Sequence, residues 1–387
     1  MTPPARTSVD SALHSVSAHP LAAHMAAHIH AAGGWVGFDD FMAQALYTPG
    51  MGYYTGGATV FGALPGALSA TGKSGSDFVT APEMSPLFGQ AVARQVAQAL
   101  RATGTDEVWE FGAGTGALAL QILDALKAQG VVLKRYTIVD LSQPLMARQK
   151  VTLQAHAPTV QWANALPAQM RGVVVGNEVL DAMPVKLLVR AGGVWHERGV
   201  GLAVDERDSL FAWQDRPTDL RPPLEVDGAH DYLTEIHPQG EAFVRTLADH
   251  LQAGAVFLID YGFPEAEYYH TQRHMGTVMC HRAHQADGDP LVDVGLKDIT
   301  AHVNFSGIAL AAQSAGLQVL GYCSQARFLL NCGLMARSDQ ATVAQRALVG
   351  HLIHEHEMGE LFKVIGLAVG EPWEAVGFAA GDRTHTL

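Results

Sequence analysis

The stretch 107-EVWEFGAGTGALALQILDALKAQG-130 decides the fold of this chain. A short apolar run at 107–111 is followed by a glycine-rich turn, and apolar residues then recur at helical spacing over 117–130. This order predicts a strand, a tight turn and a helix. Glycines in such a turn let a ligand approach the backbone, and the helix N-terminus offers unpaired N–H groups to an anionic group. We therefore expect a ligand at this turn.

The alternation of strand and helix continues on both sides of this stretch. A helix is expected at 85–100 and another at 144–156, and strands are expected at 135–140, 159–162, 171–177 and 255–262. Alternating strands and helices predict an α/β fold, a parallel Rossmann-like sheet with helices on both faces. Right-handed crossovers then place the carboxyl ends of the strands, and any ligand, along one edge.

Three further segments complete the expected architecture. Residues 1–100 predict an N-terminal cap, with two helices in 20–46 and a long glycine-rich loop after them. The core is expected over 101–335, interrupted at about 185–235 by strands separated by turns, which predict an inserted antiparallel lid. Residues 336–387 are expected to pack on the core as a C-terminal segment.

Composition excludes several classes of function. The chain has 387 residues and a formal net charge of −13, with no run of basic residues, so we expect no nucleic-acid partner. No apolar stretch approaches the roughly 18 residues of a membrane-spanning helix, so no membrane insertion is expected. The three cysteines form no C-x-x-C pair, and His354-Glu355-His356 lacks the spacing of a zinc motif, so we expect no metal. Without a secretory or transit signal, we expect a cytoplasmic protein.

The glycine turn alone does not choose between two cofactors. Gly112-x-Gly114-x-x-Ala117 also satisfies a loosened dinucleotide fingerprint, and Asp140, at the end of the second strand, would bind ribose hydroxyls in either case. Glu110 favours S-adenosylmethionine, because its carboxylate would repel the phosphates of a dinucleotide and attract an amino group or a sulfonium. Gly116, the third glycine of the turn, and Leu141, next to Asp140, complete this set of cofactor candidates.

A second polar group follows the strand at 171–177. Asn177, Glu178 and Asp181 are expected at the carboxyl edge, facing the cofactor, and Asn177 is a candidate for both cofactor binding and catalysis. In the alternative interpretation, Asn177 and Asp181 only cap the helix that follows this strand.

Several motifs together resemble one protein family. In order and spacing over roughly residues 25–370, the chain is similar to the MidA family, which itself resembles the class I S-adenosylmethionine-dependent methyltransferases. The motifs that carry this resemblance are GYYTGG (52–57), DFVTAPEMSPLFG (77–89), EFGAGTG (110–116), GNEVLDAMPV (176–185), IDYG (259–262), DPL (289–291), DITAHVNFSG (298–307), QARFLLNCG (325–333) and MGELFKVIGLA (358–368).

The resemblance also implies the identity of the substrate, which the residues alone do not indicate. The mitochondrial member of the family is an arginine methyltransferase and an assembly factor of respiratory complex I, which implies a protein substrate, a complex I subunit, and the mitochondrial matrix if the source is eukaryotic. Four features depart from the family: an apparent insertion at 57–71, Ser76 between Gly75 and Asp77, His281 in place of a tyrosine, and Asn304 in place of an acid. If that acid binds the guanidinium, Asn304 puts arginine specificity in doubt.

Methyl transfer needs alignment of the acceptor and a group that accepts a proton. For a guanidinium, a nearby carboxylate would hold positive charge away from the attacking nitrogen. Glu178 is the first candidate, oriented by Asn177 and Asp181. Asp77, Thr80 and Glu83 come from a loop that could close over the cofactor, and His302 could act as a base.

Three other functions remain open at this point. They are a nicotinamide-dependent oxidoreductase, a small-molecule methyltransferase, and an assembly factor that binds the cofactor without catalysis. The sequence also leaves the oligomeric state open, including a homodimer.

Overall fold

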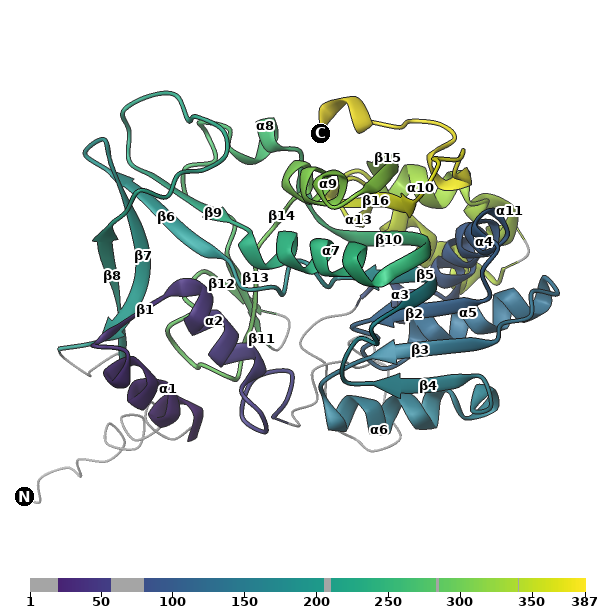
Figure 1. The fold of residues 1–387 in the computed structure, drawn as a ribbon, viewed down its shortest axis with the longest axis horizontal. Coiled ribbons are helices and arrows are strands. Elements are labelled where there is room, and N and C mark those ends of the chain that lie inside the picture. Colours follow the sequence, from purple (N-terminus) through teal and green to yellow (C-terminus); the bar gives the residue numbers. More distant parts are fainter. Residues whose placement is uncertain (1–19, 57–79, 205–209, 283–284, 340) are drawn as a thin grey trace, which may run out of the picture.

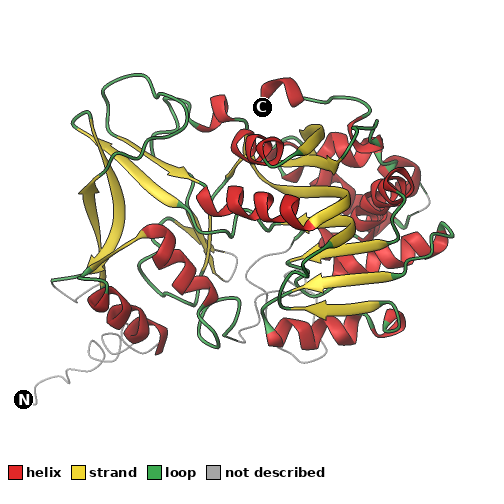
Figure 2. Ribbon diagram, in the orientation of Figure 1, coloured by secondary structure: helices red, strands yellow, loops and turns green. Residues whose placement is uncertain are grey.

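The computed structural model describes residues 20–56, 80–204, 210–282, 285–339 and 341–387. A large sheet with helices on both faces forms one half of the molecule, and an antiparallel sheet with two N-terminal helices forms the other (Figure 1). The expected α/β fold with a Rossmann-like sheet is confirmed. Figure 2 shows that the antiparallel insert stands beside the carboxyl edge of the large sheet.

The large sheet has the strand order β15-β16-β10-β5-β2-β3-β4, and β14 pairs with β10. Strands β4, β3, β2, β5 and β10 run parallel to one another. The central strand β5 is buried on both faces, and its consecutive valines suit such a position. The bounds are β2 (Glu107–Phe111), β3 (Arg135–Val139), β4 (Val160–Ala163), β5 (Met170–Asn177), β10 (Leu251–Phe263), β14 (Val303–Asn304), β15 (Leu317–Ser324) and β16 (Phe362–Val369).

Strand β16 gives this sheet a topology that differs from that of a dinucleotide-binding sheet. It lies between β10 and β15 and runs antiparallel to both. Numbered in chain order, the strands follow 3-2-1-4-5-7-6, whereas a dinucleotide-binding sheet follows 3-2-1-4-5-6. The architecture therefore argues against the oxidoreductase alternative.

Helices cover the two faces of the large sheet. One face carries α4 and α5, which pack on β5 and β10 together with α10 and α12, and the other carries α7 and α9. The bounds are α4 (Pro86–Thr103), α5 (Ala117–Ala128), α6 (Gln143–Thr152), α7 (Pro238–His250), α9 (Phe305–Ser314), α10 (Gln325–Asn331), α11 (Leu334–Ser338), α12 (Val343–Ile353) and α13 (Met358–Leu361). Among the described residues, no helix is long and apolar enough to cross a membrane.

The antiparallel half is built from two distant parts of the chain. Its sheet joins β6 (Lys186–Ala191), β7 (Val194–Leu202), β8 (Phe211–Pro217) and β9 (Tyr232–Ile236) with the N-terminal strand β1 (Trp35–Gly37), which pairs with β7. Helices α1 (Pro20–Ala31) and α2 (Phe38–Tyr47) pack against this sheet in one hydrophobic cluster. The N-terminal segment and the insert therefore pack together as one unit beside the carboxyl edge of the large sheet.

A third element lies between β10 and α9. After α8 (Glu265–Tyr268), strands β11 (Met279–Arg282), β12 (Gln285–Asp287) and β13 (Asp298–Thr300) form a small antiparallel sheet. Asn304 then caps α9, because its side chain accepts a hydrogen bond from the backbone N–H of Gly307. A cavity lies at the carboxyl edge of the large sheet, and Asn304 is not among the residues that line it. The expectation that it bears on substrate specificity is not supported by its position.

Candidate active site

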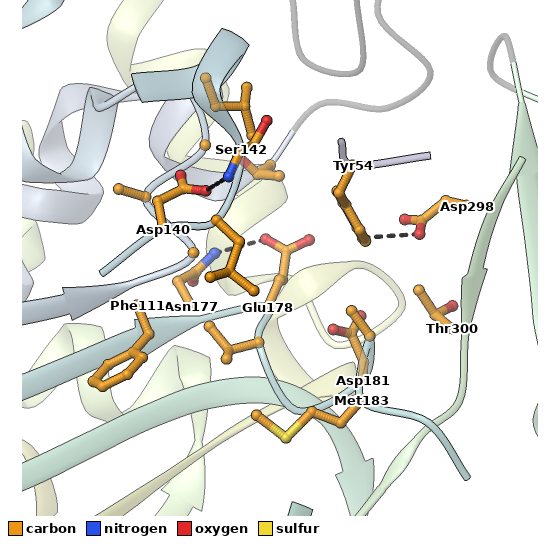
Figure 3. A pocket seen from close by; sticks show the side chains of 18 of the residues that line it. Tyr54, Phe111, Asp140, Ser142, Asn177, Glu178, Asp181, Met183, Asp298 and Thr300 are labelled. Carbon is orange, nitrogen blue, oxygen red and sulfur yellow. Dashed lines mark hydrogen bonds between the residues drawn. The ribbon is translucent and has the colours of Figure 1, made fainter. Parts of the chain in front are cut away.

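A cavity of about 810 Å³ opens at the carboxyl edge of the large sheet (Figure 3). Ligand pockets of proteins have volumes of roughly 300–1,000 Å³. The cavity lies beyond the ends of β2 and β5, where the strand order reverses, the usual position of a ligand in such sheets. The second half of its wall comes from segments 47–55 and 273–302.

The glycine turn after β2 lines part of the cavity. Gly112 and Gly114 line the cavity with φ angles of +63° and +52°, which L side chains rarely adopt. A Cβ on Gly112 would also lie 3.1 Å from the side chain of Val179. Gly116 does not line the cavity; it is the N-cap of α5.

Gln149 of α6 connects the glycine turn to the acid at the end of β3. Its Nε2 donates to Oδ2 of Asp140 at 2.7 Å and to the carbonyl of Gly114 at 3.0 Å, and its Oε1 accepts from Trp162. The other Asp140 oxygen accepts from the backbone N–H of Ser142. Burial raises the pKa of Asp140, and these hydrogen bonds oppose that effect. Gln149 thus fixes two of the predicted cofactor contacts relative to each other.

Glu110 is almost fully buried below the turn. Its Oε2 accepts a hydrogen bond from the hydroxyl of Tyr136 at 2.6 Å. Burial raises the pKa of Glu110 to about 7, and the nearby charge of Asp140 adds to this, although the Tyr136 hydrogen bond opposes it. The predicted Glu110 therefore lies at the cavity and is already engaged by a neighbour.

The short helix α3 (Ala81–Met84) covers the turn from the other side. Thr80 and Glu83 line the cavity, and Glu83 accepts a hydrogen bond from the hydroxyl of Thr115. Leu141 also lines the cavity. Asp77, the remaining cofactor candidate of this segment, lies outside the described residues.

The loop after β5 presents Glu178 to the cavity. Glu178 has a φ of +55°, a conformation that costs a non-glycine residue about 1–3 kcal/mol. Its Oε1 accepts from Nδ2 of Asn177 at 2.7 Å. Burial raises the pKa of Glu178 to about 8, and Asp260 and Asp298 add to the shift while Asn177 opposes it. A carboxylate in a strained backbone position at a cavity wall marks a functional site.

No helix begins at this loop, because β5 is followed by a turn that leads into β6. The alternative in which Asn177 and Asp181 cap a following helix is therefore wrong. Asp181 instead lines the cavity, and its carbonyl accepts from the backbone N–H of Ala301 at 2.9 Å. Burial raises the pKa of its carboxyl well above the ordinary value, and Asp260, Glu178 and Asp298 act in the same direction.

Two tyrosines and an aspartate, none of them predicted as a site residue, form the wall opposite the sheet. The Tyr54 hydroxyl donates to Oδ1 of Asp298 at 2.8 Å, and the Tyr47 hydroxyl donates to the carbonyl of Ala182 at 2.8 Å. The two rings stack with centroids 5.7 Å apart. The signals in the sequence were Tyr54 in the 52–57 motif and the aspartate that opens the 298–307 motif, whereas Tyr47 ends α2 and carries no such signal.

His302 lies at a third side of the cavity. Its ring stacks on that of Tyr261 at 6.0 Å, and its Nδ1 atom is buried without a hydrogen-bond partner. Burial lowers the pKa of His302 to about 4, and Arg273 and Lys363 contribute. The imidazole is therefore neutral near pH 7 and can accept a proton or a hydrogen bond.

The cavity has a strongly acidic lining. Among the lining residues that the structure describes, Arg273 is the single arginine or lysine, whereas the carboxyl groups are those of Glu83, Glu110, Asp140, Glu178, Asp181 and Asp298. Such a lining suits ligands that carry positive charge.

Comparisons with known proteins agree with this architecture. Residues 91–323 match the family model described as "Putative S-adenosyl-L-methionine-dependent methyltransferase". A crystal structure of a protein from Burkholderia thailandensis bound to S-adenosyl-homocysteine is 49% identical, with a TM-score of 0.88 and complete coverage of both chains. The human mitochondrial protein arginine methyltransferase NDUFAF7 is 27% identical over 85% of this chain and 79% of its own length. Its Caenorhabditis elegans homolog is 24% identical over 77% and 73%.

The family match covers more than half of the chain, and the structural likeness extends over all of it. The resemblance drawn from the sequence motifs is confirmed by these matches. The chain therefore belongs to this family of S-adenosyl-L-methionine-dependent methyltransferases.

Proposed function

We propose that this protein is a protein arginine N-methyltransferase. The observation that carries the proposal is the placement of several carboxyl groups, Glu178 foremost, in the same cavity that the glycine turn lines. A guanidinium satisfies several carboxylates at once through its planar set of N–H donors. The names of the human and nematode relatives support the same acceptor.

The residues at the sheet edge fit S-adenosylmethionine. Asp140 follows β3 where a ribose would lie, and the turn at Gly112 and Gly114 leads into the N-terminus of α5, whose first N–H groups have no partner within the helix. The Oδ1 atom of Asn177 is buried without a partner, although its Nδ2 is engaged by Glu178. An unpaired buried acceptor at the wall suits a ligand ammonium group. When bound, the cofactor supplies a methyl group activated by a sulfonium.

Glu178 has the central role among the residues of the chain. In its ionised form it holds a guanidinium edge and concentrates positive charge there, which leaves the attacking nitrogen electron-rich. The hydrogen bond from Asn177 and the neighbouring Asp181 orient it. His302, neutral near pH 7, offers its unpartnered Nδ1 atom as a hydrogen-bond acceptor to the substrate, and the proton that the acceptor nitrogen loses is released to solvent.

The proposal extends to the partner. As the family resemblance implies, the substrate is a protein, a subunit of the NADH-quinone oxidoreductase, methylated in the compartment where that complex is assembled.

Transfer of a labelled methyl group to arginine and lysine peptides tests the function. Wild-type protein is expected to label arginine peptides. Glu178→Gln is expected to lose about 100-fold or more in rate while S-adenosylhomocysteine still binds. Glu225→Gln removes an exposed carboxylate that is not part of the cavity and serves as the control. Labelling of lysine alone, or undiminished transfer by Glu178→Gln, would contradict the proposal.

A further inference from the structure

A buried carboxylate outside the cavity holds one of the cavity walls. Glu235 lies in β9 of the insert, is fully buried, and is not among the residues that line the cavity. Its Oε1 atom accepts hydrogen bonds from the backbone N–H groups of Thr277 at 2.6 Å and Val278 at 3.1 Å. Gly276 and Thr277 do line the cavity, so this side chain connects the insert to the cavity wall.

The wall segment approaches β9 closely at this point. The backbone N–H of Leu233 in β9 donates to the carbonyl of His274 at 2.9 Å, and Leu233 forms a parallel β-bridge with Met275. The next residue, Gly276, has a φ of +72°, and a Cβ there would lie 2.6 Å from Oε1 of Glu235. Any other residue at this position would displace the carboxylate. The glycine therefore lets the backbone reach the carboxylate.

The hydrogen bonds continue from Glu235 to His302. The Oγ1 atom of Thr277 accepts from the backbone N–H of His302 at 3.0 Å. The hydroxyl of Tyr268, in α8, donates to Oε2 of Glu235 at 2.9 Å and lies 3.1 Å from the same Thr277 Oγ1 atom. Nε2 of His237 lies 3.0 Å from that hydroxyl. Thr277 thus joins Glu235, which lies outside the cavity, to His302, which lines it.

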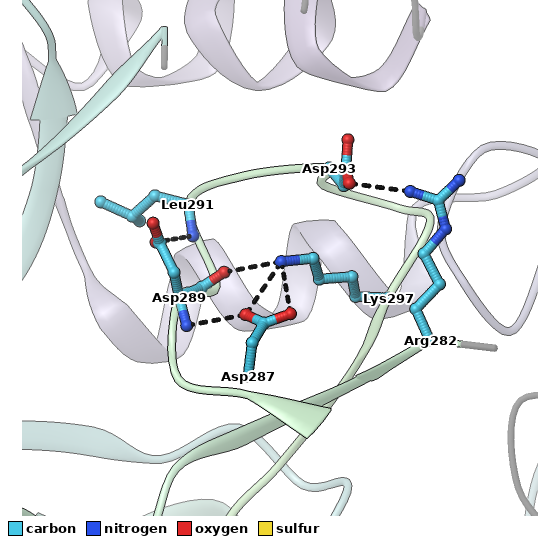
Figure 4. Close-up of polar contacts among 6 residues, drawn as sticks. All are labelled: Arg282, Asp287, Asp289, Leu291, Asp293 and Lys297. Carbon is cyan, nitrogen blue, oxygen red and sulfur yellow. Dashed lines mark hydrogen bonds and ion pairs between the residues drawn. The ribbon is translucent and has the colours of Figure 1, made fainter. Parts of the chain in front are cut away.

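The other end of the small sheet that follows this wall is held by separate contacts. The Lys297 ammonium contacts both carboxylate oxygens of Asp287 at 2.9 Å and the carbonyl of Asp289 at 3.2 Å (Figure 4). Arg282, at the end of β11, pairs with Asp293. These residues do not line the cavity. A substitution in β9 therefore leaves the contacts at that end in place.

We propose that Glu235 is a positioning residue for acceptor binding: through Thr277 it fixes His302 and the cavity wall around it. This inference rests on the proposed function, in which His302 accepts a hydrogen bond from the substrate. The predicted cofactor contacts are held by other groups, because Gln149 of α6 joins Asp140 to the glycine turn. Glu235 therefore sets the affinity for the acceptor and not the affinity for the cofactor.

Calorimetric binding of N-acetyl-arginine methylamide to protein loaded with S-adenosylhomocysteine tests this role. Glu235→Met keeps a side chain of similar length but leaves the N–H groups of Thr277 and Val278 without their acceptor. It is expected to weaken binding of this arginine probe by about tenfold or more. Glu235→Gln keeps a carbonyl oxygen for the two donors and is expected to restore the affinity to within about threefold of the wild type. Both variants should bind S-adenosylhomocysteine as the wild type does.

Glu107→Met makes the same chemical change at a buried carboxylate on the amino edge of the large sheet and serves as the control. Glu107 begins β2, pairs with Lys134 and Arg135, and does not line the cavity. The control should lose stability in urea unfolding and keep the probe affinity of the wild type. An equal loss of probe affinity in Glu107→Met and Glu235→Met would show a general effect of destabilisation and overturn the proposal.

A double-variant cycle with His302→Gln tests the route through Thr277. If Glu235 acts by placing His302, Glu235→Met should change the probe affinity by less than about threefold once His302 is already replaced. A change in this background as large as that in the wild type would show that Glu235 acts on another part of the site, which overturns the proposal.

The outcomes separate the positioning role from the function. If Glu235→Met binds S-adenosylhomocysteine and keeps the probe affinity of the wild type, the positioning role is overturned and the methyltransferase proposal stands. If wild-type protein binds S-adenosylhomocysteine but neither binds the arginine probe nor methylates arginine peptides, the proposed function fails, and this inference fails with it.

If Glu235→Met does not fold, Tyr268→Phe decides between the outcomes. This variant removes the hydroxyl that contacts Glu235 and Thr277 without altering a residue of the cavity wall. Reduced probe affinity with unchanged binding of S-adenosylhomocysteine then supports the positioning role, and unchanged probe affinity overturns it.

Discussion

Asp260 accepts a hydrogen bond at its Oδ2 atom from the backbone N–H of Leu180 at 2.8 Å, and so ties the end of β10 to the loop after β5. The same oxygen accepts from the N–H groups of Val179 and Asp181. Three donors of one turn therefore converge on one buried carboxylate. This contact holds Glu178 in its left-handed backbone conformation, which an unrestrained loop would leave.

Asp260→Asn is expected to lower the free energy of unfolding by about 1–3 kcal/mol, because the other carboxylate oxygen accepts from the backbone N–H of Tyr261 and an amide has only one accepting oxygen for the two sets of donors. Methyl transfer should fall as well, since the loop no longer fixes Glu178. Urea unfolding followed by circular dichroism measures the first effect. Asp249→Asn, on the exposed side of α7, is the control and should change stability little.

Stability of the ligand-free protein should decrease as pH rises from about 4.5 to about 8. The folded state raises the pKa of Glu178 to about 8 and that of Glu110 to about 7, from an ordinary 4.5. The folded state therefore binds these protons more tightly than the unfolded state, and the resulting stabilisation is lost as pH passes through the folded values. Thermal melts across this range should show a falling Tm. A flatter profile is expected for Glu178→Gln, and an identical profile would contradict the assignment.

Binding of a cationic acceptor should release a proton near pH 7. Glu178 is mostly protonated in the free protein at that pH, and a guanidinium favours its ionised form. Calorimetry of an arginine peptide in two buffers of different ionisation enthalpy counts the protons. Wild-type protein should release close to one, and Glu178→Gln fewer. For the same reason kcat/KM should rise with pH up to about 8.

Gln149→Met should weaken S-adenosylhomocysteine binding by about tenfold, because Asp140 and the carbonyl of Gly114 both lose their shared donor. Stability should fall less than in a core deletion, since methionine has a similar volume. Gln161→Met, on the exposed side of β4, is the control. Equal binding by both variants would show that Gln149 does not set the position of Asp140.

Local sequence patterns were sufficient to predict the elements around the proposed cofactor site at the glycine turn. The run 107–130 predicted β2, the turn and α5 because glycine, apolar periodicity and capping act over a few residues. The antiparallel insert was also predicted, because turns separate its strands. The antiparallel direction of β16 was not predicted, because a strand of apolar residues has the same sequence pattern in a parallel or an antiparallel position.

The part of the cavity that is proposed to bind the acceptor was harder to predict. Asp298 and Tyr54 are 244 residues apart, and no local pattern joins them. Gln149 lies in a helix with a mixed polar sequence, where a solvent-exposed position is the ordinary expectation, yet it is fully buried. Asn304 was interpreted as a possible loss of substrate specificity, but its amide performs the same capping role as a carboxylate.

The position of β16 has a consequence for biosynthesis. This strand is inserted between β10 and β15, so the sheet cannot close until the chain has been translated through Val369 and has left the ribosome. Until then the edges of β10 and β15 lack their partner, and such high contact order slows folding and exposes unpaired strands. The nascent protein is therefore expected to depend on chaperones late in synthesis, after the strands around the glycine turn have been translated.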